Sequence, residues 1–139
     1  MNRVIEKKLS ANDIGATGAH QAGILIPKKD SLLSFFPELN PEDVNPRAVI
    51  RFIDELNYEW KFNFIYYNNK FRGGTRNEYR LTGMTPFFKQ NAAKVDDVLI
   101  FRYDGDEYYI KLNKETNYIE GEDGVTTLVL DDTWKVINY

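Results

Sequence analysis

The sequence predicts a mainly β domain with seven or eight short strands and two short helices, arranged as a barrel or pseudobarrel. Two observations lead to this fold class. Apolar residues, many of them aromatic, occur in short runs, and turn-forming Gly, Asn, Asp and Pro residues separate the runs. The 139 residues, of which 42% are apolar and 14% aromatic, are also enough to build one hydrophobic core. We therefore expect residues 1–139 to form a single domain.

The first part of the chain is expected to contain two strands and one helix. Val4–Ser10 and Ala22–Ile26 have the composition of strands, and the second ends at a proline, which cannot donate to a sheet. Asp30 is a suitable N-cap for a helix over Ser31–Phe36, which stops before another proline.

Three strands are expected in the middle of the chain. Glu59–Tyr67 is the clearest of them, because aromatic residues alternate there with Lys61 and Asn63. The aromatic side chains should therefore face the core. The other two strands are Ala48–Ile53 and Tyr79–Thr82.

The remaining elements are one helix and four strands. Thr85 and the proline after it fit an N-cap and a first helical position, so a short helix is expected over Thr85–Asn91. The sequence Asp104-Gly105-Asp106 predicts the turn of a hairpin. The four strands are Val98–Tyr103, Tyr108–Leu112, Thr126–Leu130 and Trp134–Ile137.

Composition excludes several kinds of functional site. The absence of cysteine excludes disulfides, zinc–thiolate sites and cysteine nucleophiles, and the one histidine, His20, excludes a multi-histidine metal site. No apolar run approaches the roughly 18 residues of a membrane span, and the amino terminus lacks a secretory apolar region. We expect a cytoplasmic protein of bacterial type with no membrane partner.

The net charge of −3 conceals an asymmetry along the chain. Residues 1–94 carry a net charge of +4, and residues 95–139 carry −7. Residues 61–94 hold seven basic residues and a single acid, Glu78. A nucleic-acid-binding protein needs a local positive face rather than a basic average. The basic segment is therefore a candidate interface, and the acidic carboxyl-terminal third should lie away from DNA.

Two glycine-rich polar loops, Ser10–Gln21 and Lys70–Arg80, are the candidate binding elements. Glycine lets a backbone approach a ligand closely. Arginine can contact guanine or phosphate, asparagine can pair with adenine, and glutamate can accept from the cytosine amine. The residues predicted to contact DNA are Ser10, Asn12, Asp13, Thr17, His20 and Gln21 in the first loop, and Lys70, Arg72, Thr75, Arg76, Asn77, Glu78, Tyr79 and Arg80 in the second.

Two alternative functions use other residues. Glu59-Trp60-Lys61 has the local form of a PD-(D/E)xK nuclease motif, with Asp54 or Asp43 as the upstream acid that would help to hold a divalent metal. Such triplets are common, and the charged ends of a strand explain this one better. Aromatic residues near the basic loop, such as Tyr66, could instead stack on single-stranded nucleic acid. Stacking does not explain Asn77 and Glu78 in the loop.

Three segments resemble a known family. LSANDIGATGAHQAGILIPK (Leu9–Lys28), IYYNN (Ile65–Asn69) and GTRNEYRLT (Gly74–Thr82) are similar, in this order, to the amino-terminal effector-binding domain of the EcoRII restriction endonuclease. The resemblance implies the open DNA-binding pseudobarrel of the plant B-three transcription-factor domains. It also implies two arms that grip the major groove at an extra copy of the recognition sequence, which is CCWGG for EcoRII itself.

The resemblance also implies roles for individual residues. His20 matches a first-arm histidine, and Arg76, Asn77, Glu78 and Arg80 match second-arm residues. The chain departs from the type member at three places: Leu25 replaces a tyrosine, and Gly74 and Tyr79 replace lysines.

The resemblance has further consequences for the kind of molecule. We expect a non-catalytic domain, monomeric when isolated and part of a longer restriction endonuclease. It would need no cofactor to bind double-stranded DNA, and Mg²⁺ would serve only a separate nuclease domain in the same full-length chain.

Overall fold

The computed structural model describes residues 2–16, 23–69, 73–114, 126–129 and 133–138. Within these ranges the chain forms nine strands in one sheet and two short helices. Each of the nine segments named above as a strand corresponds to one of them, so the predicted total of seven or eight is too low. In chain order the elements are β1 (Arg3–Lys8), β2 (Gly23–Ile26), α1 (Asp30–Leu33), β3 (Arg47–Ile53), β4 (Glu59–Tyr67), β5 (Glu78–Thr82), α2 (Thr85–Gln90), β6 (Val98–Tyr103), β7 (Tyr108–Asn113), β8 (Thr126–Val129) and β9 (Trp134–Asn138).

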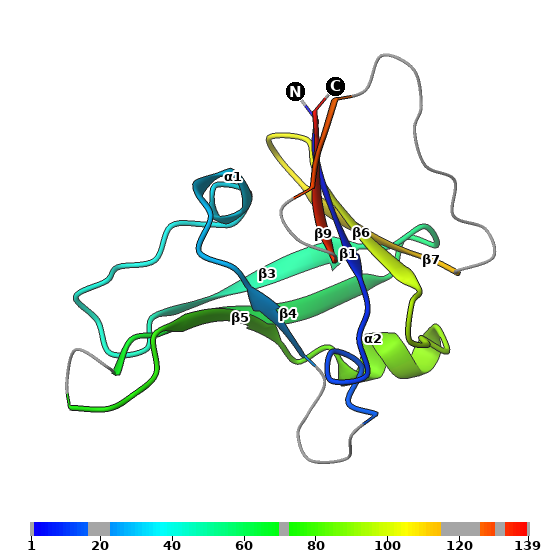
Figure 1. Cartoon of the computed structure of the whole chain (residues 1–139). Helices are drawn as coiled ribbons and strands as arrows, with labels where there is room; N and C mark the ends of the chain where they lie inside the picture. Colours follow the sequence, from blue (N-terminus) through cyan, green and yellow to red (C-terminus); the bar gives the residue numbers. More distant parts are fainter. Residues whose placement is uncertain (1, 17–22, 70–72, 115–125, 130–132, 139) are drawn as a thin grey trace.

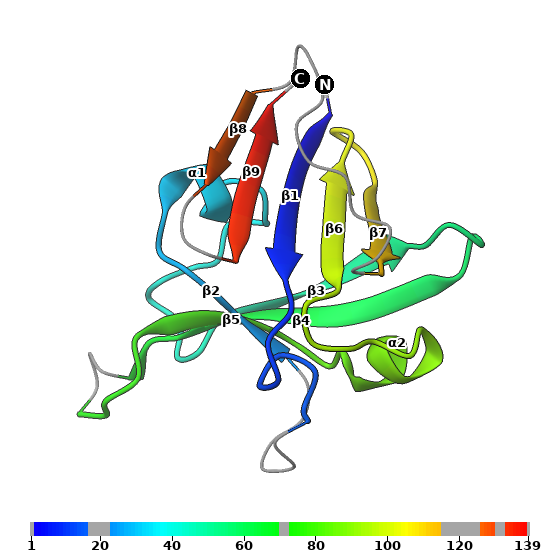
Figure 2. The same cartoon turned by 45° about the vertical axis from the view of Figure 1, so that its right-hand side comes forward.

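The sheet has the strand order β2-β5-β4-β3-β7-β6-β1-β9-β8. Neighbouring strands are antiparallel except β3 and β7, which pair in parallel through Phe52 with Tyr108 and Ile53 with Tyr109. This short pairing joins two groups of strands that cross at a steep angle (Figures 1 and 2). The result is a curled, open sheet, and the mainly β prediction is confirmed.

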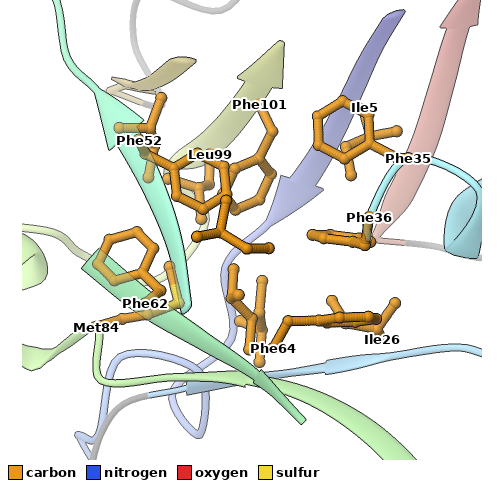
Figure 3. Close-up of a cluster of buried hydrophobic side chains, with 14 of the residues drawn as sticks. Ile5, Ile26, Phe35, Phe36, Phe52, Phe62, Phe64, Met84, Leu99 and Phe101 are labelled. Carbon is orange, nitrogen blue, oxygen red and sulfur yellow. The ribbon is translucent and has the colours of Figure 1, made fainter. Parts of the chain in front are cut away.

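The core lies inside the curl and is rich in aromatic residues. The predicted alternation of β4 is confirmed, because Phe62 and Phe64 are fully buried whereas Lys61 is exposed. Figure 3 shows the rings of both groups of strands meeting there, with Phe36 stacked on Phe64 at 4.6 Å between ring centroids. Burial of these large rings is the main favourable term in folding.

Both helices begin one residue earlier than their predicted caps imply. The caps are Lys29 and Met84, and neither makes a side-chain capping hydrogen bond, so the predictions of Asp30 and Thr85 as N-caps are wrong. Lys29 has an extended backbone, and Asp30 instead places its carboxylate in the first turn of α1, where the helix dipole favours negative charge. No helix in the described part of the chain has the length and apolar character needed to cross a membrane.

Candidate nucleic-acid interface

A cleft of about 580 Å³ lies between the two predicted loops. We call Ser10–Ala16 the first arm and Gly73–Arg80 the second arm. In Figure 2 the first arm points downward from the sheet and the second arm projects to the lower left. Residues of both arms line the cleft, together with parts of β1, β2, β5 and β9: Lys7, Ser10, Asn12, Asp13, Gly23, Leu25, Pro27, Arg76, Arg80, Thr82, Thr133 and Trp134.

The floor of the cleft follows from the alternation of β2 and β5. These strands are antiparallel neighbours, with Leu25 opposite Arg80. Ile24 and Leu81 point into the core and are fully buried, so their neighbours along each strand face the cleft. The same sheet therefore has an apolar face toward the core and a mixed face toward the cleft.

Glu78 connects the two arginines of the second arm. Its Oε1 accepts from Nε of Arg76 at 3.1 Å and lies 3.1 Å from a terminal nitrogen of the same guanidinium. Its Oε2 accepts from Nε of Arg80 at 3.1 Å. The guanidinium of Arg76 also lies 3.6 Å from the ring centroid of Tyr67, a favourable cation–π arrangement. Two cations are therefore held in fixed positions at the cleft, with one net positive charge among the three side chains.

The backbone of the second arm is shaped by Asn69. Its carbonyl accepts from the amide of Gly74 at 2.7 Å, and its side-chain oxygen accepts from the amide of Arg76 at 2.9 Å. A Cβ at Gly74 would lie 2.7 Å from Cγ of Asn69, which is closer than real Cβ atoms approach. Gly74 is therefore required by this turn, and the lysine found there in the type member would not fit this conformation.

Tyr79 does not reach the cleft. Its ring stacks between Phe64, at 5.6 Å, and Tyr66, at 4.3 Å between centroids. Burial and the neighbouring Tyr66 hydroxyl raise the pKa of Tyr79 above its ordinary value. The strand alternation explains this position, because Glu78 and Arg80 occupy the opposite face of β5. The Tyr66 hydroxyl donates to Oδ1 of Asn77 at 2.7 Å, so this aromatic stack also anchors the second arm.

Asp13 fixes the first arm to the sheet. Its carboxylate lies 2.9 Å from the Lys7 ammonium, and the two side chains are only 10% and 8% exposed. Asp13 and Ser10 also exchange two hydrogen bonds: the Ser10 amide donates to Oδ2 of Asp13, and the Asp13 amide donates to the Ser10 hydroxyl. The Lys7 ammonium lies 5.8 Å from the centroid of the Trp134 ring. Asp13 thus has a structural task in addition to its place at the cleft wall.

The structure brings five predicted residues to the cleft: Ser10, Asn12, Asp13, Arg76 and Arg80. Glu78 accepts a hydrogen bond from Arg76, and Asn77 lies between these two residues in the chain and accepts from the Tyr66 hydroxyl. Thr75 is exposed on the second arm. The predicted residues Thr17, His20, Gln21, Lys70 and Arg72 lie outside the described residues.

Sequence reasoning did not predict seven of the residues that line the cleft: Lys7, Gly23, Leu25, Pro27, Thr82, Thr133 and Trp134. It also missed the supporting roles of Tyr67 and Asn69. Of the contacts described above, only the Ser10–Asp13 pair could be recognised from neighbouring residues. A Ser followed three residues later by an acid commonly forms reciprocal hydrogen bonds between side chain and backbone. Lys7 stands between Glu6 and Lys8 in β1, and nothing in its neighbourhood along the chain predicts the partner Asp13.

The residues of the alternative nuclease motif have structural partners. Asp54 accepts from the Trp60 indole at 2.8 Å and from the amides of Leu56 and Tyr58. Burial opposes ionisation of Asp54, but these hydrogen bonds outweigh it, and its pKa lies below the ordinary value. Glu59 pairs with Arg51 at 3.1 Å. Among the described residues, no three His, Cys, Asp or Glu side chains are grouped so that they could hold a metal ion.

Comparison with known proteins gives matches to one family and one fold. The family model described as Restriction endonuclease EcoRII, N-terminal, matches residues 2–98. The type II restriction enzyme EcoRII of Escherichia coli is 39% identical over 79 residues, which make up 55% of this chain and 19% of the relative. The match thus spans about a fifth of that relative's length.

Two solved structures have a similar fold. The Arabidopsis FUS3–DNA complex gives a TM-score of 0.60 at 21% identity, covering 78% of this chain and 94% of that one. The Arabidopsis thaliana transcription factor LEC2–DNA complex gives 0.59 at 24% identity, covering 82% and 96%. This likeness confirms the open pseudobarrel expected from the resemblance to plant B-three domains.

Proposed function

The chain belongs to the family of EcoRII amino-terminal domains, and on this premise we propose that it is a non-catalytic domain that binds double-stranded DNA at a specific sequence. The observation that supports this most is the cleft, which has two oriented arginines on one wall and hydrogen-bonding groups of the first arm on the other. The two structures of similar fold are both complexes with DNA. The major groove of B-DNA is about 12 Å wide and can admit such arms.

Arg76 and Arg80 contact guanine or phosphate in this proposal. The Nε of each arginine donates to Glu78. Terminal N–H groups of each guanidinium remain for the fork-like contact that guanine O6 and N7 accept. Glu78 has two roles. It orients both arginines before DNA arrives, and its remaining lone pairs can accept from a cytosine amine, since a carboxylate offers about four acceptor positions.

The other assignments follow the arms. Asn12 reaches a base or the backbone from the first arm, and Asn77 from the second, once DNA competes with Tyr66 for its side-chain oxygen. In the family resemblance His20 matches a first-arm histidine, and we propose that His20 and Gln21 complete the base or backbone contacts. Thr17, Lys70, Arg72 and Thr75 complete the proposed set of contacts. Tyr79 contributes by supporting the second arm through its ring stack.

The proposal extends to a longer protein. The chain's relative is a restriction enzyme about five times the length of the matched region. We infer that this domain binds a CCWGG-like effector site and thereby regulates or targets a nuclease domain in the same full-length chain. DNA binding here needs no cofactor, and Mg²⁺ serves the nuclease domain.

The experiment is a gel shift without metal, using a CCWGG duplex and a scrambled duplex of the same composition. The proposal expects tighter binding to CCWGG, and equal affinity for both would remove the claim of specificity for this site. A parallel reaction with Mg²⁺ tests the non-catalytic assignment, because cleavage by this chain alone would favour the nuclease alternative.

Arg76→Ala distinguishes base reading from phosphate binding. Loss of a bidentate guanine contact should cost about 1–3 kcal/mol on the specific duplex and little on the scrambled one. A loss of the same size on both duplexes would assign Arg76 to the phosphate backbone instead. Arg51→Ala is a suitable control, because Arg51 pairs with Glu59 and Glu107 away from the cleft.

A further inference from the structure

Leu25 is an exposed apolar side chain within a polar cleft. It lies in the middle of β2, lines the cleft, and is 44% exposed, whereas its neighbours Ile24 and Ile26 are buried in the core. A single exposed leucine on a protein surface needs no explanation. This one deserves an explanation because of its position between two arms that carry charged and hydrogen-bonding groups.

The cleft face of β2 has no polar side chain near Leu25. Its neighbours on this face are Gly23 and Pro27. A Cβ at Gly23 would lie 2.9 Å from the Leu81 carbonyl oxygen, so this position stays without a side chain. Leu25 is therefore the side chain that projects from this part of the floor.

Leu25 lies directly opposite Arg80 in the antiparallel pairing of β2 with β5. Side chains in such pairs have Cβ atoms about 5 Å apart, so both can reach neighbouring bases, which are stacked about 3.4 Å apart along one strand. The guanidinium of Arg80 is held by Glu78. Arg80, which can bind guanine, and Leu25, which can contact an apolar group, therefore lie side by side in the cleft.

The major-groove edge of DNA offers one apolar group, the C5-methyl of a pyrimidine. We propose that Leu25 contacts the C5-methyl group of a pyrimidine next to the guanine that Arg80 contacts. This inference rests on the proposed function. Thymine carries such a methyl group, and so does 5-methylcytosine, and the experiment separates these two sources.

The experiment selects binding sites from a randomised duplex library with the intact chain, in parallel with Leu25→Ala. One library is made with thymine, one with deoxyuridine in place of thymine, and one with 5-methylcytosine in place of cytosine. Affinities for the selected duplexes are then measured. Leu56→Ala is the matched control, because Leu56 is 76% exposed and lies in the β3–β4 turn.

The proposal expects the intact chain to enrich a methyl-bearing pyrimidine beside a guanine. Removing the methyl from that base should weaken binding about fourfold, the effect of one buried methyl-sized group. Leu25→Ala should bind the methylated and unmethylated duplexes equally, while Leu56→Ala keeps the fourfold ratio. If affinity falls when deoxyuridine replaces thymine, Leu25 contacts the methyl group of thymine. If affinity rises when 5-methylcytosine replaces cytosine, Leu25 contacts the methyl group of 5-methylcytosine.

Three other outcomes overturn the inference, and they differ in meaning. If the intact chain enriches a sequence with no dependence on either methyl, Leu25 does not read methyl groups although the proposed function stands. If a methyl weakens binding of the intact chain more than of Leu25→Ala, Leu25 excludes methyl groups rather than accepting them. If no library yields an enriched sequence, the proposed function itself fails.

Discussion

At the scale of single residues, the first arm depends on one buried ion pair. The Lys7 ammonium and the Asp13 carboxylate are both largely shielded from water, so each charge needs the other. The pair connects β1 to the wall of the cleft, because Asp13 also accepts from the Ser10 amide. A residue outside both loops therefore takes part in positioning the proposed DNA-binding surface.

Lys7→Met tests this pair. The substitution keeps much of the side-chain volume but leaves Asp13 buried without a cation, and we expect the free energy of unfolding to fall by about 3 kcal/mol. Urea denaturation followed by fluorescence measures it. The control is Lys8→Met, because Lys8 is half exposed and lies 3.8 Å from Asp96, an ion pair worth less than about 1 kcal/mol. Equal losses in the two variants would contradict a special role for Lys7.

At the scale of elements, the second arm is held by one close backbone contact and one stack of rings. Gly74 and Asn69 form the contact, and Tyr66 and Tyr79 form the stack. The contact lies outside the core, and the stack lies at its edge, because Tyr79 packs against the core cluster. The conformation of this arm can therefore change without unfolding of the sheet.

Gly74→Ala should separate binding from stability. The added Cβ would force Asn69 to move and displace the Arg76 backbone that Asn69 holds. We expect a loss of about 1–3 kcal/mol in affinity for the specific duplex with an almost unchanged thermal midpoint. Gly105→Ala is the converse control: Gly105 lies in the β6–β7 turn with φ of 96°, which disfavours alanine, so this variant should lower the thermal midpoint and keep DNA binding. Full binding by Gly74→Ala would show that the turn tolerates a side chain.

Tyr108 links β7 to the segment after α1. Its hydroxyl donates to the Phe35 carbonyl at 3.0 Å, and burial, with a smaller effect of Tyr103, raises the pKa of Tyr108 from 10.0 to about 12. A raised pKa means that the folded state favours the neutral hydroxyl. The stability from this group is therefore complete below pH 10.0 and is lost as the pH rises toward about 12.

Chemical denaturation at several pH values tests the role of Tyr108. The free energy of unfolding should fall between pH 10.0 and about 12, and Tyr108→Phe should reduce this fall. Tyr58→Phe provides a control, because Tyr58 is an exposed tyrosine in the β3–β4 turn. An identical decline in the parent chain and in Tyr108→Phe would rule out a contribution from Tyr108.

At the scale of the whole molecule, topology places one acidic turn away from the proposed interface. The wider expectation that the carboxyl-terminal third lies away from DNA is not met throughout, because Thr133 and Trp134 line the cleft and Asp96 lies 3.8 Å from Lys8, near the first arm. The β6–β7 turn, which contains Asp104 and Asp106, lies at the upper end in Figures 1 and 2, and both arms lie at the lower end. An overall charge of −3 is therefore compatible with a local interface for DNA.

Local patterns predicted much of this fold, and long-range contacts explain what they missed. The alternation in β4 and the hairpin turn after Tyr103 are confirmed because each depends on neighbours in the chain. The predicted helix Ser31–Phe36 is shorter in the structure, since α1 ends at Leu33 and Phe35 and Phe36 enter the core. The ion pair of Lys7 and the parallel pairing of β3 with β7 have no local signature at all.

The candidate site could be predicted in part for the same reason. The motif of the second arm named Arg76, Glu78 and Arg80, because their chemistry is visible in the sequence. The sequence could not show that Tyr79 turns toward the core or that Leu25 turns toward the cleft. Both positions depend on how β2 and β5 pair.

The central claim is that arginines in the cleft read the major groove of a specific duplex, and methylation interference tests it most directly. Dimethyl sulfate methylates guanine at N7 in the major groove and adenine at N3 in the minor groove. The account predicts that methylation at guanine N7 within the selected site prevents binding and that methylation at adenine N3 there does not. Interference at adenine N3 alone, or no interference at any guanine, would contradict it.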